Sequence, residues 1–138
     1  MIKRKKAVLI FFGVWVISFI VVLTKPPHGM GKTEVTQLQL RVLSVRLAII
    51  YEEELEFPED MGKFIQHEVF QEYLAEREQY GATLKHIITD SWGEDFIYRR
   101  INENHVVLVS KGADQKLNTS DDIQFSAERK SVKNSEGN

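Results

Sequence analysis

The sequence predicts an α+β fold in which an N-terminal transmembrane helix is followed by one small domain. The domain is expected to contain a central helix, a second helix and a small three-stranded antiparallel sheet. Three observations carry this prediction: an uncharged apolar run near the N-terminus, apolar residues that then repeat every three or four positions, and short β-branched or aromatic runs separated by turn-forming residues near the C-terminus.

The apolar run extends from Ala7 to Thr24. Its 18 residues would form a helix about 27 Å long, close to the thickness of the hydrocarbon core of a bilayer. Four cations precede the run and one follows it, so the positive-inside rule places the N-terminus in the cytoplasm. A cleaved signal peptide is the alternative, but the run is longer than a usual signal core and no A-x-A-like site follows it. The sequence therefore predicts a single-pass inner-membrane protein with a periplasmic C-terminal domain and membrane lipid as a partner.

Composition divides the chain into four parts. Residues 1–24 form the basic tip and the anchor, and residues 25–32 form a Pro/Gly linker. Residues 33–126 are the predicted domain. Residues 127–138 are polar and cannot bury enough apolar surface to become ordered, so a disordered tail is expected.

The charge of the chain argues against one class of partner. The formal net charge is −2, and it falls to −6 when the four cations of the N-terminal tip are set aside. An acidic domain is a poor ligand for nucleic acid and is compatible with binding cations. The chain has no cysteine, so no disulfide can stabilise the domain and a bound ion could take that role.

Two helices are predicted in the first half of the domain. Thr33 is expected to cap the central helix, which should run to about Glu54 with a broad apolar face. This face is made of two rows: Val35, Leu38, Val42, Val45 and Ile49, and beside them Leu40, Leu43, Leu47 and Ile50. The second helix should run from Glu59 to Tyr80 and stop at Gly81. Its acidic row Glu68, Glu72 and Glu76 is interpreted as facing solvent, because like charges four residues apart repel.

Three strands are predicted after a turn at Trp92 and Gly93. They are Phe96–Ile101, Val106–Ser110 and Ile123–Ser126, and the residues Asn102, Glu103 and Asn104 should form the first hairpin turn. The connection between the last two strands, residues 111–122, is called the acidic loop below. It contains Asp114, Asp121 and Asp122, and such carboxylates repel one another unless water or a hard cation such as calcium neutralises them. The loop lacks the EF-hand pattern, and a solvated turn is the alternative interpretation.

The two segments TDSWGEDFIY (Thr89–Tyr98) and VVLVSKGADQKLNTSDDI (Val106–Ile123), taken together, resemble the C-terminal half of the major pseudopilin, the G subunit, of bacterial type II secretion systems. The resemblance implies a pilin-like domain whose loop binds one calcium ion. It implies Asp114, Asp121 and Asp122 as side-chain ligands, and the backbone carbonyls of Lys111 and Thr119 as further ligands. The chain departs from the family in its N-terminal segment, which lacks the prepilin leader and the Glu of the family's apolar helix.

The resemblance, together with the apolar N-terminal run, implies one of two functions. The first is a membrane-anchored, calcium-binding structural or accessory protein of a type II secretion or pilus-like assembly, whose partners would be other pseudopilins or secretion-system proteins. The second is a stand-alone binding module that has the fold but does not polymerise. An enzyme is not predicted, because the histidines are scattered and the sequence contains neither HExxH nor GxSxG, no phosphate-binding glycine loop and no cysteine nucleophile. No small-molecule substrate is indicated.

Overall fold

A computed structural model describes residues 29–129. The chain divides into two compact units, Met1–Met30 and Gly31–Asn138, and the account below concerns the second unit as far as residue 129. The predicted anchor, residues 25–28 of the predicted linker and residues 130–138 of the predicted tail lie outside the described residues.

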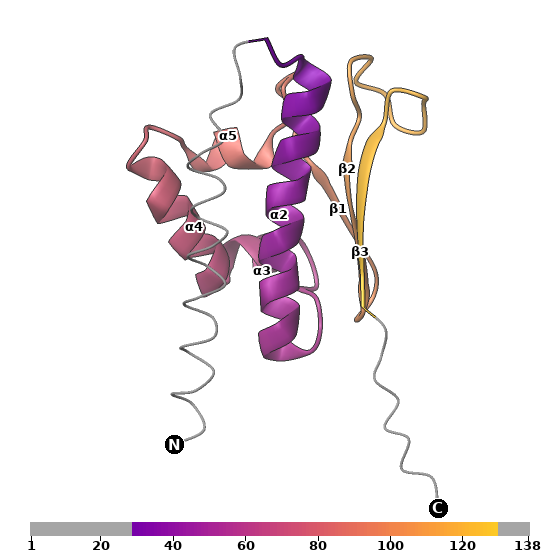
Figure 1. Ribbon diagram of the computed structural model, residues 1–138. Coiled ribbons are helices and arrows are strands. Elements are labelled where there is room, and N and C mark those ends of the chain that lie inside the picture. The colour runs from indigo at the N-terminus through magenta and orange to yellow at the C-terminus, as the bar shows by residue number, and fades with distance from the viewer. Residues whose placement is uncertain (1–28, 130–138) are drawn as a thin grey trace, which may run out of the picture. The chain divides into compact units, whose positions relative to one another are not determined.

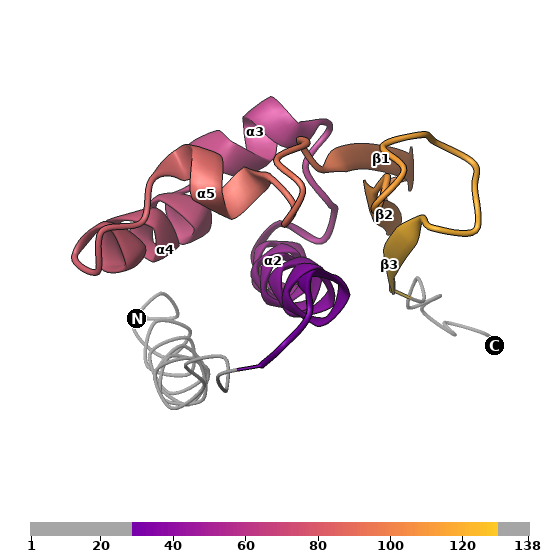
Figure 2. The ribbon, with the colours of Figure 1, turned by 90° about the horizontal axis from the view of Figure 1, so that it is seen from above.

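The described unit is an α+β arrangement with one helix at its centre. Figures 1 and 2 show α2 between a three-stranded sheet on one side and the shorter helices on the other. The sheet is antiparallel with the strand order β1-β2-β3. In chain order the elements are α2 (Lys32–Glu54), α3 (Met61–Gln66), α4 (Glu68–Glu78), α5 (Leu84–Ile88), β1 (Ile97–Asn102), β2 (His105–Ser110) and β3 (Ile123–Glu128).

The central helix forms where its apolar spacing predicts, although its start differs. The N-cap is Gly31, which makes no side-chain capping bond, so the prediction that Thr33 caps the helix was wrong. Of the two apolar rows, the second is the buried one: Leu40, Leu43, Leu47 and Ile50 are at most 1% exposed. The first row is only half-buried. The helix stops at Leu55, whose left-handed backbone (φ 61°) lets its N–H donate to the Tyr51 carbonyl.

The predicted second helix is in fact two helices, with a third following. The chain between α3 and α4 is extended at His67, where the side-chain Nδ1 accepts a hydrogen bond from the Val69 N–H and caps α4. This cap replaces a helical hydrogen bond and so ends one helix and begins the next. The short helix α5 was not predicted; it starts at a capping box in which Thr83 and His86 exchange hydrogen bonds.

The predicted sheet is present with small shifts at the strand ends. The register places Tyr98, Leu108 and Phe125 side by side across the three strands. Asn102 pairs with His105, so the hairpin turn is tight, as the Asn-Glu-Asn sequence indicates. β3 continues to Glu128, two residues into the stretch predicted to be a disordered tail, because Ala127 and Glu128 pair with β2.

The hydrophobic core lies between α2, the inner face of the sheet and the short helices. Its largest fully buried side chains are aromatic, Phe57, Phe64 and Phe70, and burying one such side chain contributes about 1.5–3 kcal/mol. Phe64 and Phe70 meet edge to face, with ring centres 5.0 Å apart. α2 packs on β3 and β2, which fixes the strands that carry the acidic loop.

The predicted fold class requires one correction. Among residues 29–129, no helix is both long enough and apolar enough to cross a membrane. The longest helix of this part, α2, carries charged residues such as Lys32, Glu34 and Arg41 along its length. The fold that the structure describes is therefore α+β with a three-stranded antiparallel sheet, and a membrane-spanning helix is not part of it.

Candidate functional site

The acidic loop leaves the sheet after Ser110 and returns at Ile123, and these two residues are paired across β2 and β3. Figure 1 shows the loop at the end of the sheet nearest the start of α2. Gly112 closes the base of the loop, because a Cβ built on it would lie 2.0 Å from the carbonyl oxygen of Asp121. Only glycine fits this approach, so the backbones of Gly112 and Asp121 are held close together near the two ends of the loop.

The backbone of the loop takes the left-handed conformation at three positions. These are Gly112 (φ 67°), Gln115 (φ 56°) and Asn118 (φ 66°). Asparagine tolerates this conformation, whereas for glutamine it costs about 1–2 kcal/mol. Such strain persists where the surrounding contacts impose it, and it is commoner at ligand sites than elsewhere.

The predicted carboxylate ligands lie on the same loop but are not gathered around one point. The Asp114 Oδ1 accepts from the Lys116 N–H at 2.9 Å, and the Asp122 Oδ2 accepts from the Asn118 N–H at 2.8 Å. Within residues 29–129 the Asp121 carboxylate makes no hydrogen bond or ion pair. In this same part of the chain, no group of three or more acidic or histidine side chains is placed to hold a metal ion.

One carboxylate oxygen of the loop is buried without a partner. The Oδ1 of Asp122 is inaccessible to solvent and has no hydrogen-bond partner among the described residues. An unsatisfied buried polar atom costs about 1–3 kcal/mol, more when the group is charged. The Asp122 Oδ1 is therefore the atom of the loop with the greatest need of a further donor or cation.

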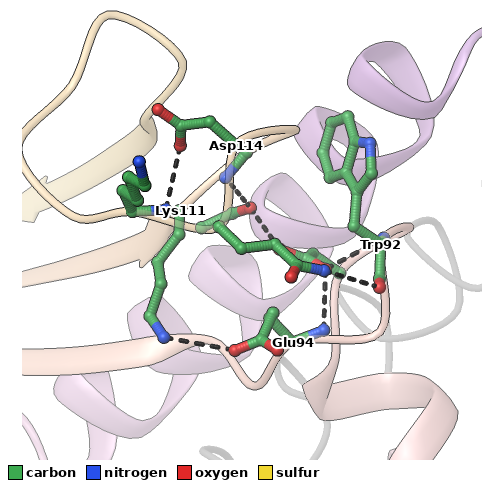
Figure 3. A network of polar contacts seen from close by, with 9 residues as sticks. Trp92, Glu94, Lys111 and Asp114 are labelled. Atoms are coloured by element: carbon green, nitrogen blue, oxygen red, sulfur yellow. Dashed lines mark hydrogen bonds and ion pairs between the residues drawn. The ribbon is translucent and has the colours of Figure 1, made fainter.

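The two predicted carbonyl ligands come from opposite halves of the loop. The Thr119 carbonyl accepts a long hydrogen bond of 3.3 Å from the Asp122 N–H, which leaves a second lone pair on that oxygen. Lys111 precedes the close approach at Gly112, and its side-chain Nζ lies 3.1 Å from the Glu94 carboxylate. Figure 3 shows this ion pair joining the loop to the turn that carries Trp92.

Sequence reasoning missed two buried polar residues beside the loop. Asp90 is 5% exposed and Ser110 is fully buried, and the Ser110 hydroxyl donates to the Asp90 carboxylate at 2.5 Å. Asp90 begins the Trp92 turn (residues 90–94), and an aspartate two residues before Trp-Gly is a recognisable turn signal. Its contact with the end of β2 has no local signal, because it depends on how the sheet packs.

A further buried polar residue lies away from the loop, where α2 packs on α4. Arg46 is 3% exposed, and its guanidinium carbon lies 4.6 Å from the centre of the Tyr73 ring. Burial lowers the pKa of Arg46 and raises the pKa of Tyr73, while the nearby Glu76 and Glu72 partly restore the pKa of Arg46. Of the acidic row on α4, Glu68 and Glu72 are exposed, as interpreted from the sequence, whereas Glu76 is half-buried and acts with Glu72 on this arginine.

The three histidines in the described part of the chain each serve a local contact in a different place. His67 Nε2 is paired with the Glu54 carboxylate at 2.9 Å, and His86 belongs to the capping box of α5. His105 Nε2 contacts the Ser126 hydroxyl across the sheet at 2.8 Å. The structure does not bring these side chains together.

Comparison of the chain with protein-family models, with curated protein sequences and with solved structures finds no match.

Proposed function

We propose that this chain is a calcium-binding, pseudopilin-like structural or accessory subunit of a type II secretion or pilus-like assembly. The proposal is supported by the resemblance of the Trp92 turn and the acidic loop to the major pseudopilins. The single observation that carries it is the buried, unpartnered Oδ1 of Asp122 in a loop closed at its base by Gly112.

The donors of the loop suit calcium, which binds carboxylate and carbonyl oxygens in flexible geometry. In Asp114 and in Asp122, one carboxylate oxygen accepts a hydrogen bond from a backbone N–H, and the other oxygen is available to bind an ion. Asp121 and the carbonyls of Lys111 and Thr119 complete the proposed donor set. When bound, the ion would neutralise the repulsion between the carboxylates and supply the partner that the Asp122 Oδ1 lacks.

The role of the ion in this proposal is structural. A ligand that binds only the folded state adds about 2.7 kcal/mol of stability at a hundredfold excess over its dissociation constant. Sites of extracellular proteins have calcium dissociation constants of about 0.1–1 mM. The loop would therefore be ordered where calcium is plentiful, and it would hold the edge of the sheet formed by β3.

The calcium proposal is tested by the thermal midpoint of the full chain with excess calcium, with magnesium and with chelator. The midpoint is expected to rise with calcium alone, and the rise should disappear in Asp121→Ala. Glu72→Ala is the matched control, since it removes an exposed carboxylate of α4 and should keep the calcium response. Equal midpoints in the three conditions would refute the proposal.

The assembly role has its own test. The full chain is co-expressed with the pseudopilins of its host, and the purified material is examined for a defined complex. A complex that requires the intact loop supports the assembly role. If calcium binds but no complex forms, the chain would be a stand-alone binding module.

A further inference from the structure

A buried polar contact joins the Trp92 turn to the end of β2. Both carboxylate oxygens of Asp90 are used, and they face in different directions. The Oδ1 accepts from the backbone N–H groups of Trp92 and Glu94 at 3.0 Å each, and the Oδ2 accepts from the Ser110 hydroxyl at 2.5 Å. Asp90 thus holds the shape of the turn with one oxygen and the start of the acidic loop with the other.

The hydrogen bonds continue from Asp90 into the loop, and each donor points toward Asp90: Gly112 donates to Ser110, which donates to Asp90. The Ser110 oxygen accepts from the Gly112 N–H at 3.1 Å. A serine hydroxyl has a single hydrogen, which here is given to Asp90, so its oxygen can only accept from Gly112. Gly112 is also the residue whose backbone lies against Asp121. A shift of the loop backbone at its base therefore acts directly on Ser110 and, through Ser110, on Asp90.

The same turn is tied to the beginning of α2. Thr36, which is fully buried, accepts from the Ser91 N–H at 3.1 Å and donates to the Ser91 hydroxyl at 3.0 Å. Outside the buried contacts, the Gln115 side chain donates to the Trp92 carbonyl at 3.5 Å. In Figure 3 the Trp92 ring points away from this polar network. The acidic loop, the Trp92 turn and the start of α2 are thus linked without a break.

We infer that Asp90 is a positioning residue that couples ion binding in the acidic loop to the Trp92 turn and the start of α2. This inference rests on the proposed calcium binding. Asp90 is not one of the proposed ligands; it fixes Ser110 and, through it, the Gly112 amide, so that the base of the loop is placed for the ion. Residues behind the ligands of a metal site commonly act in this way. Because coupling is reciprocal, an ion that orders the loop also orders the turn.

The experiment uses the full chain carrying Trp15→Phe, so that Trp92 is its only tryptophan. Calcium is titrated while Trp92 fluorescence is recorded, and binding is measured independently by calorimetry. The fluorescence is expected to change with the same calcium dependence as the heat of binding. Asp90→Asn keeps one oxygen, which can accept from the backbone N–H groups of Trp92 and Glu94. Its NH₂ group replaces the second oxygen, and it cannot accept the Ser110 hydrogen because it is a donor. It should weaken calcium binding about 10- to 100-fold, the range typical of residues that support metal ligands.

Asp95→Asn is the matched control, because it makes the same chemical change at an exposed aspartate one residue beyond the turn. It should bind calcium as the reference chain does. Ser110→Ala is the second variant if Asp90→Asn does not fold. It removes the link to the loop but leaves Asp90 with its two backbone donors, and it should weaken binding in the same range.

The outcomes separate the two proposals. If the Trp15→Phe chain binds no calcium, the proposed function fails. If it binds calcium but Trp92 does not respond, or if the folded Asp90 or Ser110 variant binds as tightly as Asp95→Asn, the coupling is refuted while calcium binding stands.

Discussion

Replacing Gly112 with alanine tests whether the acidic loop depends on the close approach at its base. The new Cβ would lie 2.0 Å from the Asp121 carbonyl oxygen and 2.7 Å from its carbonyl carbon, whereas real Cβ contacts essentially never fall below 3.0 Å. The obstacle is backbone, which cannot rotate aside as a flexible side chain can. The base of the loop must therefore open in the variant.

The expected cost has two parts. An alanine held in the left-handed conformation of Gly112 (φ 67°) costs about 1–2 kcal/mol. The contact between the new Cβ and the Asp121 backbone must also be relieved, which lowers the free energy of unfolding by about a further 1–3 kcal/mol. The free energy of unfolding of Gly112→Ala should thus fall by about 2–5 kcal/mol. Gly81 is the matched control: its φ is 81°, but a Cβ there meets nothing within 4 Å. Gly81→Ala should lose only about 1–2 kcal/mol.

The assay is urea unfolding of the full chain in chelator, followed by circular dichroism and extrapolated linearly to zero denaturant. The calcium-dependent rise in the thermal midpoint is then measured for both variants. It should be lost in Gly112→Ala and kept in Gly81→Ala. Equal unfolding free energies for the two variants, with the calcium response intact in both, would refute the reasoning about the loop base.

Three further predictions concern the core, a helix cap and pH. Leu47→Ala should lower the free energy of unfolding by about 2–5 kcal/mol. Leu55→Ala is the control: Leu55 is 72% exposed, so this variant should change the free energy of unfolding by less than about 0.5 kcal/mol. Similar urea midpoints for the two variants would contradict the prediction. His67→Ala removes the side chain whose Nδ1 accepts from the Val69 N–H and caps α4, and it should lower the free energy of unfolding by about 0.5–2 kcal/mol. An unchanged free energy of unfolding would mean that the cap contributes nothing. Burial raises the pKa of Tyr98 above its ordinary value of 10.0, so the unfolded chain releases this proton at a lower pH than the folded chain does. The stability due to Tyr98 should be complete below about pH 10 and fall as the pH rises further. Tyr98→Phe should flatten this alkaline decline in urea titrations, and an identical decline would rule the explanation out.

The features that local sequence predicts are those whose cause is local. The apolar spacing of Leu40, Leu43 and Leu47 is enough to place α2 and its buried face. The Asn-Glu-Asn turn and the β-branched runs beside it are enough to place the hairpin of β1 and β2. In each case the pattern repeats within a few residues, so no distant contact is needed to recognise it.

The features that were missed depend on contacts between distant residues or on competition within a loop. His67 divides the predicted second helix because its side chain caps α4 and pairs with Glu54 of α2. Asp90 is buried because it meets Ser110, which is 20 residues away in the sequence. The resemblance to the major pseudopilins implies that Asp114 and Asp122 share an ion, but it cannot show that each carboxylate first accepts from a nearby backbone N–H.

Calorimetric titration of calcium into the full chain tests the central claim most directly. The proposal predicts binding of a single ion with a dissociation constant of about 0.1–1 mM. It also predicts that Asp122→Asn, which alters the carboxylate bearing the buried, unpartnered oxygen, abolishes the binding. No calcium binding to the reference chain, or equal binding by Asp122→Asn, would contradict the claim that the acidic loop is a calcium site.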